Sequence, residues 1–470
     1  MSSPPARAAA AGSSLRPLAI DRRSILGLAW PVILTNLLTT AVSWVDLLMV
    51  SRLGTEAVAA VGLAGFMQTL AWAVLMSLQM GTAILVAQAW GRGDRERADH
   101  VTTQALVSAS GLALAISVVV CWPGNPLLDW SFLAFDAEPS VAAIGADYLR
   151  VVLAALTAMI VSLVGQAALR SIGDTRTPLW LTGAANLLNI VFNSLLIFGL
   201  LGFPALGAVG AAWGTLIARS CEGLAYVAIL AGRRRGVGLR WSSVRPQRAT
   251  LGELLRLGLP SSGEQLVMNT GFLLYNRVIA AYGTEALAAY QVGVILLQAS
   301  FMPGFGFSVA ATTLVGQWVG AGDRDTAREA GRRCRDLAVL MMSALGVVFF
   351  FVAEPFTRFV LDDPLVVGNA VSFIRMLALS QPAMAIHFAL SGALRGASDV
   401  RAPLGASVVA MYGVRLPIAA IAAFVAHAPI LWVWVAMLCA HTVRATLLSW
   451  RWRGLGWQTR AGLPIASSTS

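Results

Sequence analysis

One carboxylate stands inside an apolar segment long enough to span a membrane. Asp46 lies in the stretch from Leu28 to Leu63, whose first half is about 20 residues of apolar sequence, enough to cross a ~30 Å hydrocarbon core as a helix. A charge at the centre of such a helix costs about 2.5–3.5 kcal/mol, so it usually faces a bundle interior or a wet cavity. An acid in these surroundings can bind a proton or a sodium ion in one state and release it in another. We therefore expect Asp46 to couple transport to a cation, and to be the metal ligand if that cation is sodium.

Other polar side chains share a helix face with Asp46. Asn36, Thr39 and Ser43 precede it at spacings of three and four residues, which places all four on one side of a 3.6-residue helix. The opposite side of this segment is apolar. We expect Asn36, Thr39 and Ser43 to line a substrate cleft.

A second polar stripe runs along the apolar segment at about 178–200. Asn186, Asn189 and Asn193 are three and four residues apart and again share one helix face. Polar groups within a bilayer need partners, and Asp46 is a natural one, so we expect these asparagines to support cation coupling. Polar packing between helices is the structural alternative for the same stripe.

The second half of the chain offers further candidates. Glu264 follows Pro260 closely and is either a second coupling acid or a carboxylate stabilised by the unpaired N–H groups of a helix start. His387 lies well inside an apolar segment, where it could carry a proton or be an ordinary core histidine. Gln265 and Asn269 join these as possible coupling or substrate residues. For the substrate cleft we add Gln291 and the soft, adaptable side chains of Met67 and Met302.

Some arginines have an acidic residue three or four positions later. Three such pairs are Arg170 with Asp174, Arg219 with Glu222, and Arg395 with Asp399. We expect Arg219 and Glu222 to neutralise each other on one helix face. The other two pairs occupy corresponding loops, and we expect them to lock those loops.

The chain contains a tandem repeat. The sequence GTEAVAA that begins at Gly54 returns as GTEALAA from Gly283, so the offset in numbering is 283 − 54 = 229. The same offset relates Pro31 to Pro260, Gln88 to Gln317, and Gly91-x-Gly-Asp94 to Gly320-x-Gly-Asp323. Further on, Ala168-Leu-Arg170 returns as Ala393-Leu-Arg395, and here the offset is 393 − 168 = 225. Two halves of similar structure are expected.

Composition identifies the class of protein. Hydrophobic residues make up 57% and charged residues 12%, and the mean hydropathy is +0.72, which is typical of an integral membrane protein. All 34 basic residues are arginine, and because they fall in alternate loops, they indicate membrane orientation and not nucleic-acid binding. The four cysteines are scattered, with no metal-site or disulfide spacing. No GxxxxGK[ST] or HExxH motif is present, so neither an ATP-driven pump nor an enzyme is indicated.

The hydropathy pattern predicts an all-α membrane protein of twelve transmembrane helices. The apolar segments lie at about 25–50, 57–87, 103–122, 141–169, 178–200, 207–231, 253–280, 286–316, 335–353, 366–394, 404–426 and 428–450. By the positive-inside rule both termini are cytoplasmic. We expect a disordered cytoplasmic tail at 1–24, an N-lobe at 25–231, a basic cytoplasmic linker at 232–252, a C-lobe at 253–450 and a cytoplasmic tail at 451–470. Six helices per repeat give two parallel repeats that flank a central cleft, an arrangement used for alternating access.

These motifs together resemble one transporter family. The first segment from Trp30-Pro31 to Val45-Asp46, the GTEAxAA sequence, the Gln88–Asp94 loop, ALRSIGDTRTP and Asn186-Leu-Leu-Asn189, with their second copies, are similar to the multidrug and toxic compound extrusion (MATE) family. The likeness covers about 25–450 and is greatest to the bacterial DNA-damage-inducible F-like branch. The family often has a second aspartate where this chain has Asn193, so Asp46 would titrate largely alone.

The resemblance implies a function. It implies a multi-pass protein of the bacterial plasma membrane that exports organic, often cationic and lipophilic, compounds in exchange for protons or sodium. No cofactor beyond the coupling ion and no nucleic-acid partner is expected, and a monomer is the simplest expectation, because one chain would hold the whole pathway. A lipid-linked saccharide flippase of the same superfamily is the alternative.

Overall fold

The protein is built from helices. The computed structural model describes residues 17–122, 138–233, 235–454 and 456–460, with the backbone alone for 66, 69–74 and 460, and these residues contain helices and no strand. In a bilayer no water is available for backbone N–H and C=O groups, and a helix pairs these groups within itself. Long apolar segments that must cross lipid therefore fold as helices.

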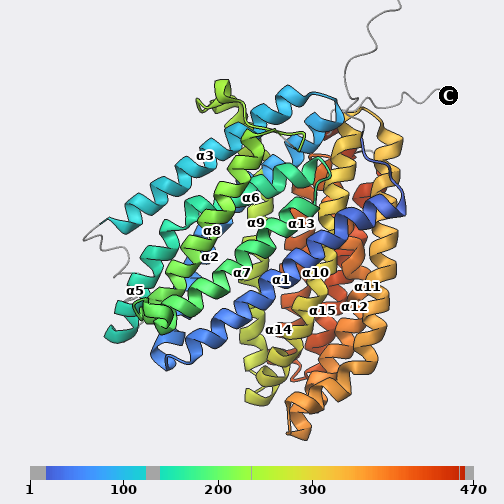
Figure 1. Ribbon diagram of the computed structural model, residues 1–470. Coiled ribbons are helices and arrows are strands. Elements are labelled where there is room, and N and C mark those ends of the chain that lie inside the picture. Colours follow the sequence, from blue (N-terminus) through green and yellow to red (C-terminus); the bar gives the residue numbers. More distant parts are fainter. Residues whose placement is uncertain (1–16, 123–137, 234, 455, 461–470) are drawn as a thin grey trace, which may run out of the picture.

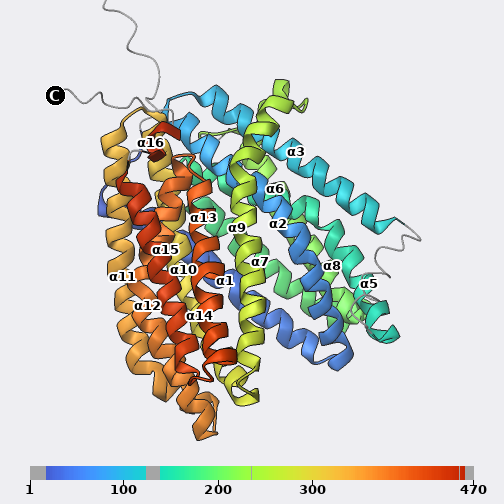
Figure 2. The same ribbon diagram turned by 180° about the vertical axis from the view of Figure 1, so that it is seen from behind.

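Figures 1 and 2 show the helices in two groups that follow the two halves of the sequence. The first half forms α1 (Arg22–Ser51), α2 (Thr55–Gly91), α3 (Arg95–Cys121), α5 (Pro139–Ala154), α6 (Leu156–Ser171), α7 (Arg176–Phe198), the short η1 (Leu200–Gly202) and α8 (Gly207–Ala231). The connection contains η2 (Trp241–Ser243). The second half forms α9 (Arg248–Ala280), α10 (Thr284–Gly320), α11 (Arg324–Val360), α12 (Pro364–Gly396), α13 (Arg401–Val408), η3 (Val409–Arg415), α14 (Leu416–Ala420), η4 (Ile421–Val425), α15 (Leu431–Arg453) and α16 (Gly456–Arg460).

Each of the twelve predicted segments has a helical counterpart. Within the described ranges, nine helices are long and apolar enough to cross a membrane, and α5 with α6, bent by 43°, make a tenth span. The run from Arg401 to Val425 counts as one span, with π-helical turns at η3 and η4. The remaining two counterparts are α2, whose side chains are described in part, and α9, which carries the charged residues Glu253, Arg256, Glu264 and Arg277 in its apolar stretch.

Several helices begin earlier than their apolar segments predict. The segment expected at 335–353 belongs to α11, which begins at Arg324 because the Asp323 side chain accepts a hydrogen bond from the Thr326 N–H. Asp94 caps α3 in the same way at the N–H of Arg97, and Asp21 caps α1 at that of Ser24. An N-cap carboxylate stabilises polar first turns that hydropathy does not reveal.

The expected tail and linker are partly held by the helices. Residues 1–16 and 461–470 of the predicted tails lie outside the described residues. Leu18 accepts a hydrogen bond from the Trp318 indole at 3.0 Å and donates to the Gln317 side chain at 2.9 Å. In the linker, the Gly238 N–H donates to the buried Asp99 on α3 at 2.7 Å. The residues just before α1 and the linker between α8 and α9 are therefore each fixed to helices by hydrogen bonds.

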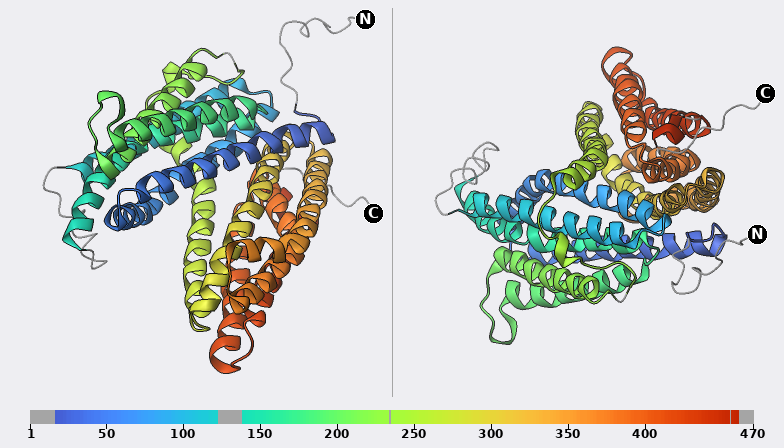
Figure 3. Two further views of the ribbon diagram at one scale, coloured as in Figure 1. Left: turned by 60° about the horizontal axis from the view of Figure 1, so that its bottom comes forward. Right: turned by 90° about the horizontal axis from the view of Figure 1, so that it is seen from above.

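Two helices bridge the two halves. The start of α1 contributes Ile25 and Leu28 to the large core of the second half, whereas Val50 near its end packs with residues of the first half. Its repeat counterpart α9 does the reverse: Leu254 joins the core of the first half and Ile279 that of the second. Figure 3 shows α1 passing obliquely beside the second-half helices. The halves are therefore two lobes joined by crossing helices.

The lobes meet tightly at one end. Gln88 on α2 donates its side-chain amide to the carbonyl of Gly396 at 2.8 Å, and Gln317 on α10 donates to that of Ser171 at 2.8 Å. Gly91 permits this contact, since a Cβ there would lie 1.8 Å from the Gln317 carbonyl oxygen. The connections between α2 and α3, α8 and α9, and α10 and α11 gather at this same end (Figures 1 and 2), and arginines lie in these connections or in the first turn of the helix that follows.

Candidate functional site

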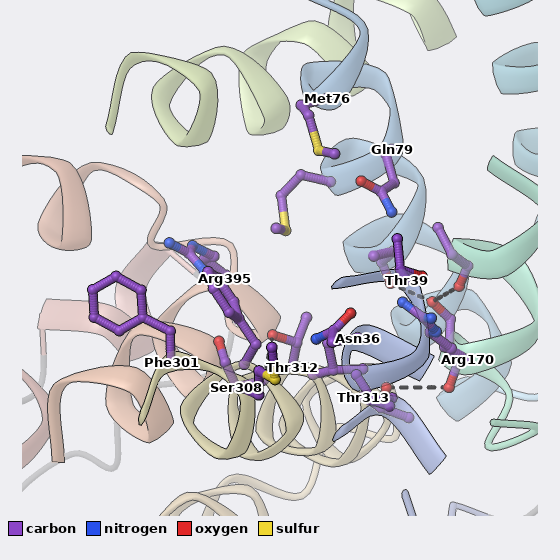
Figure 4. Close-up of a pocket in the computed structure, with 18 of the residues that line it drawn as sticks. Asn36, Thr39, Met76, Gln79, Arg170, Phe301, Ser308, Thr312, Thr313 and Arg395 are labelled. Carbon is purple, nitrogen blue, oxygen red and sulfur yellow. Dashed lines mark hydrogen bonds between the residues drawn. The ribbon is translucent and has the colours of Figure 1, made fainter. Parts of the chain in front are cut away.

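A cavity of about 500 Å³ lies between the lobes (Figure 4). Its walls come from α1, α2 and α6 of the first half and from α10 and α12 of the second. Of the residues predicted to line the cleft, Asn36, Thr39 and Met302 do so. The volume is typical of a site for a drug-sized molecule.

Other predicted cleft residues lie elsewhere. Ser43 is one turn beyond Thr39 on α1, is exposed, and donates its hydroxyl to the Thr39 carbonyl at 3.1 Å. Gln291 is exposed on α10, and Met67 packs against the core of the first half. These three side chains do not line this cavity, because helix periodicity gives a side chain's face and does not say which neighbour covers it.

Gln265 and Asn269 also lie away from the cavity. They are exposed, and the Gln265 amide donates to the Asn269 side chain at 2.9 Å. The adjacent Glu264 is buried. One residue turns an α-helix by about 100°, so Glu264 faces the protein and Gln265 does not.

Two arginines that were not expected in the cleft belong to the cavity wall. Arg170 near the end of α6 and Arg395 near the end of α12 both line the cavity, on opposite sides of it in Figure 4. The predicted loop pairs are wrong: Asp174 caps Thr177 and faces Arg235, and Asp399 pairs with Arg451. The sequence does contain one indication that the two arginines act together: they occupy equivalent positions in the two repeats.

Asp46 meets the asparagine stripe as predicted from helix spacing. Asn193 on α7 donates its amide to Asp46 Oδ1 at 2.7 Å. Exchanging the nitrogen and oxygen of the Asn189 amide brings its nitrogen within 3.2 and 3.3 Å of the two carboxylate oxygens, while its oxygen accepts from the Thr215 hydroxyl at 3.2 Å. Asn186, one turn earlier, is not part of this group and lies 3.5 Å from Arg219 Nη2.

Glu222 is the centre of a compact charged group in the first lobe. It lies buried on α8 and accepts from Arg219 at 2.8 Å, as predicted, and from the Thr182 hydroxyl at 2.8 Å. The result is a neutralised carboxylate inside the lobe.

Glu264 on α9 holds the corresponding group of the second lobe. It accepts from Arg395 at 2.6 Å, from Arg444, and from the Ser407 hydroxyl at 3.0 Å. Its interior position excludes the alternative of an exposed helix start, because the helix begins sixteen residues earlier at Arg248. A carboxylate that accepts from two guanidinium groups is held by charge-assisted hydrogen bonds, which are stronger than neutral ones.

His387 lies in the second lobe near this group. Its ring is buried and stacks on that of His441, with 5.3 Å between centroids and 5° between planes. Neither ring nitrogen of His387 has a hydrogen-bond partner among the described residues. The repeat counterpart of Asp46 in this lobe is Tyr275, whose hydroxyl donates to the Val433 carbonyl at 2.6 Å and whose ring lies under Arg415. The carboxylate of the first lobe is therefore not repeated.

Comparison with known proteins agrees with this architecture. The MatE family profile matches residues 31–195 and again 260–421, once in each repeat. The chain is 29% identical over 443 residues to the probable multidrug resistance protein NorM of Thermotoga maritima, with 94% of each chain covered. It is 31% identical over 451 residues to the multidrug resistance protein NorM of Burkholderia vietnamiensis, with 95% of this chain and 96% of that protein covered.

A solved structure shows the same fold. The structure described as MATE in complex with MaL6 superposes with a TM-score of 0.87 at 22% identity, covering 96% of this chain and all of that one. The predicted two-lobed, all-α membrane fold is confirmed, whereas the finer assignment to the DNA-damage-inducible F-like branch stays a prediction. The profile matches in both repeats and the NorM relatives span nearly the whole chain, so the protein belongs to the MatE family of multidrug and toxic compound extrusion transporters and is not an enzyme.

Proposed function

We propose that this protein is a secondary active antiporter of the plasma membrane that exports organic compounds in exchange for protons or sodium carried by Asp46. The relatives named as multidrug resistance proteins support export of small molecules. A single chain encloses the cavity, which supports a monomer as the working unit. With the arginine-rich end placed in the cytoplasm, the tight contact of the lobes closes the inner face and the cavity faces outward.

One observation carries the proposal: Asp46 is held by neutral amides, while the fully buried carboxylates are held by arginines. Within the described part of the chain, the fully buried acids are Asp99, Glu222, Glu264 and Asp399, and each forms an ion pair with at least one arginine. Protonating any of them would leave a guanidinium without its counter-charge, which is costly in a dry interior. Asp46 can gain or lose a cation while its partners, Asn189 and Asn193, remain neutral.

The cavity and the cation site share one helix. Asp46 lies seven residues after Thr39 on α1, about 10 Å along the axis at about 1.5 Å per residue. Pro31 interrupts the hydrogen-bond ladder of α1, and its carbonyl accepts from the Thr35 hydroxyl at 2.7 Å. A proline inside a helix is a place where it can bend. Cation binding at Asp46 would change how α1 packs against α7, and this change would reach the cavity wall through α1.

A single coupling cation is energetically sufficient. Moving one charge inward across about 100 mV supplies about 2.3 kcal/mol, or roughly a fiftyfold substrate gradient. One carboxylate can therefore drive useful export without a partner aspartate at Asn193.

The second candidate is a lipid-linked saccharide flippase. Arg170 and Arg395 in the cavity wall favour it, since anionic head groups pair with guanidinium groups. A flippase moves lipid between leaflets and does not require the cation site at Asp46.

Transport by purified protein in proteoliposomes tests the proposal. Efflux of a fluorescent organic substrate is followed under a proton gradient alone and under a sodium gradient alone, for the wild type, Asp46→Asn and the matched control Ser43→Ala. We expect one gradient to drive efflux, with Asp46→Asn abolishing the response and Ser43→Ala retaining it, because Ser43 is exposed and outside the site. Normal gradient-driven efflux by Asp46→Asn would overturn the role of Asp46.

A further inference from the structure

The cavity wall carries positive charge and no negative charge. Arg170 and Arg395 are its charged residues, and no carboxylate lines it within the described chain. Both guanidinium groups approach the cavity from opposite lobes (Figure 4). A cation placed between them would be repelled from both sides.

Neither lobe neutralises its arginine completely. No carboxylate of the described residues forms an ion pair with Arg170, and its buried Nε has no hydrogen-bond partner. The nearby Glu222 is already paired with Arg219 at 2.8 Å. Glu222 is thus paired with Arg219, and Arg170 is left without a carboxylate partner among the described residues.

The second lobe has the same imbalance. Glu264 forms ion pairs with both Arg395 and Arg444, so one negative charge is shared by two positive charges. The neighbouring His387 and His441 add no negative charge. Asp46 accepts from Asn193 and lies outside the cavity wall.

This arrangement recurs in the two repeats. Three pairs of positions related by the offset of 225 have the same role: Arg170 and Arg395 face the cavity, Thr182 and Ser407 donate hydroxyls to the glutamate, and Arg219 and Arg444 pair with it. The glutamates themselves come from different helices, α8 and α9. The two repeats thus share two arginines and one hydroxyl residue at equivalent positions. In each lobe, one of the two arginines faces the cavity.

The rest of the wall suits an apolar body. Met76, Met80, Phe301, Met302 and Phe305 contribute sulfur and aromatic surface. Methionine adapts to varied shapes, and rings supply flat apolar area. Beside this surface, a guanidinium fork matches the geometry of carboxylate, sulfonate or phosphate oxygens.

We infer that the substrate is an anionic amphiphile, whose acidic group binds between Arg170 and Arg395 while its apolar part packs on the methionine and phenylalanine side chains. This inference rests on the proposed function in taking the cavity as the substrate site, and it replaces the cationic class implied by the family resemblance. The same chemistry could come from a free amphiphilic acid or from an anionic lipid.

Binding to protein in phosphatidylcholine nanodiscs tests the charge preference without any gradient. The probes are 11-(dansylamino)undecanoate and the same dansyl chain ending in trimethylammonium. We expect the wild type to bind the anion at least about tenfold more tightly than the cation, the range of one charge-assisted hydrogen bond. Arg170→Gln should weaken anion binding about tenfold without weakening cation binding, since it removes a charge that attracts the anion and repels the cation. Arg170→Lys should recover part of the loss.

Arg277→Gln is the matched control, because it removes an exposed arginine of α9 outside the cavity. Arg170 is the better test position than Arg395, whose loss would disturb the Glu264 group and the fold. Equal affinity for both probes, or equal behaviour of Arg170→Gln and Arg277→Gln, would overturn the inference. Because no gradient is used, these outcomes are independent of the Asp46 transport assay, whose failure would overturn antiport alone.

Two transport arms distinguish the sources of the anion. Efflux of the dansyl acid from proteoliposomes would identify a free amphiphile, and dithionite-detected flipping of nitrobenzoxadiazole-labelled phosphatidylglycerol would identify a lipid. Either result, sensitive to Arg170→Gln, supports the anionic class. Transport of the trimethylammonium probe in place of both would refute it.

Discussion

Gln88 and Gln317 occupy the same position in the two repeats and make the same contact in opposite directions. Gln88 donates to the carbonyl at the end of α12, and Gln317 donates to the carbonyl at the end of α6. The accepting residues, Gly396 and Ser171, are themselves related by the offset of 225 and so are repeat counterparts. The closed end is thus held by two equivalent hydrogen bonds, and opening it requires both to break.

Replacing either glutamine should loosen the closed end by a similar amount. Gln88→Ala or Gln317→Ala leaves a buried carbonyl unpaired, at a cost of about 1–3 kcal/mol, so the lobes should separate there more often. Double electron–electron resonance between spin labels at Arg92 and Ala321, also repeat counterparts, measures the separation. The exposed amide variant Gln265→Ala should behave as wild type. A marked difference between the two glutamine variants would contradict their equivalence.

A methyl group at Gly91 should act more strongly than loss of a hydrogen bond. The Cβ of Gly91→Ala would meet the Gln317 carbonyl oxygen at 1.8 Å, a backbone atom that cannot turn away. The same spin-label distance should therefore lengthen and transport should fall at least tenfold, since such a clash costs more than about 1.4 kcal/mol. Gly27→Ala on α1 is the matched control, because nothing lies within 4 Å of the added carbon. Normal transport by Gly91→Ala would show that the lobes do not need this close contact.

Glu264→Gln should destabilise the second lobe severely. The change leaves Arg395 and Arg444 facing one another without a counter-charge, and breaking a buried ion pair costs about 3–5 kcal/mol. Thermal unfolding in detergent should show a clear drop in midpoint. Glu253, also on α9, forms an exposed ion pair with Arg97 of α3, so Glu253→Gln should change the midpoint little. An unchanged midpoint in Glu264→Gln would mean that Glu264 is already protonated.

The cap of α11 should make stability sensitive to acid. The Thr326 N–H and hydroxyl donate to Asp323 at 3.0 and 2.7 Å and lower the pKa of that carboxyl below its ordinary value of 3.8. The stabilisation is therefore complete above about pH 4 and is lost as the pH falls through the lowered value. Asp323→Asn, which can still cap the helix but does not titrate there, should flatten this acid-side loss. Unfolding midpoints measured from pH 3 to 7 test the difference, and identical profiles would exclude a contribution from Asp323.

The sequence predicts the fold well because its signals are strong and local. Apolar runs, loop arginines and repeated motifs predict the helices and the two lobes, and helix spacing alone places Asn189 and Asn193 on the side that meets Asp46. Polar first turns escape prediction, because caps such as Asp323 act through hydrogen bonds that hydropathy does not register.

Pairings between distant helices are less predictable. Arg395 has Asp399 four residues away, yet it pairs with Glu264, which is 131 residues distant. Proximity in sequence favours Asp399, but α12 ends before it, and the chain turns away toward Arg451. Only the packing of α9 against the later helices decides which carboxylate Arg395 meets.

The reciprocal glutamine contacts also bear on how such a chain could arise. Two copies of a half-length ancestor related by a twofold axis would satisfy both contacts with a single glutamine and a single helix end per copy, as an isologous dimer does. Asp46 and its counterpart Tyr275 show a difference that fusion of the two copies permits. One half carries a carboxylate where the other carries a tyrosine, a specialisation closed to two identical subunits.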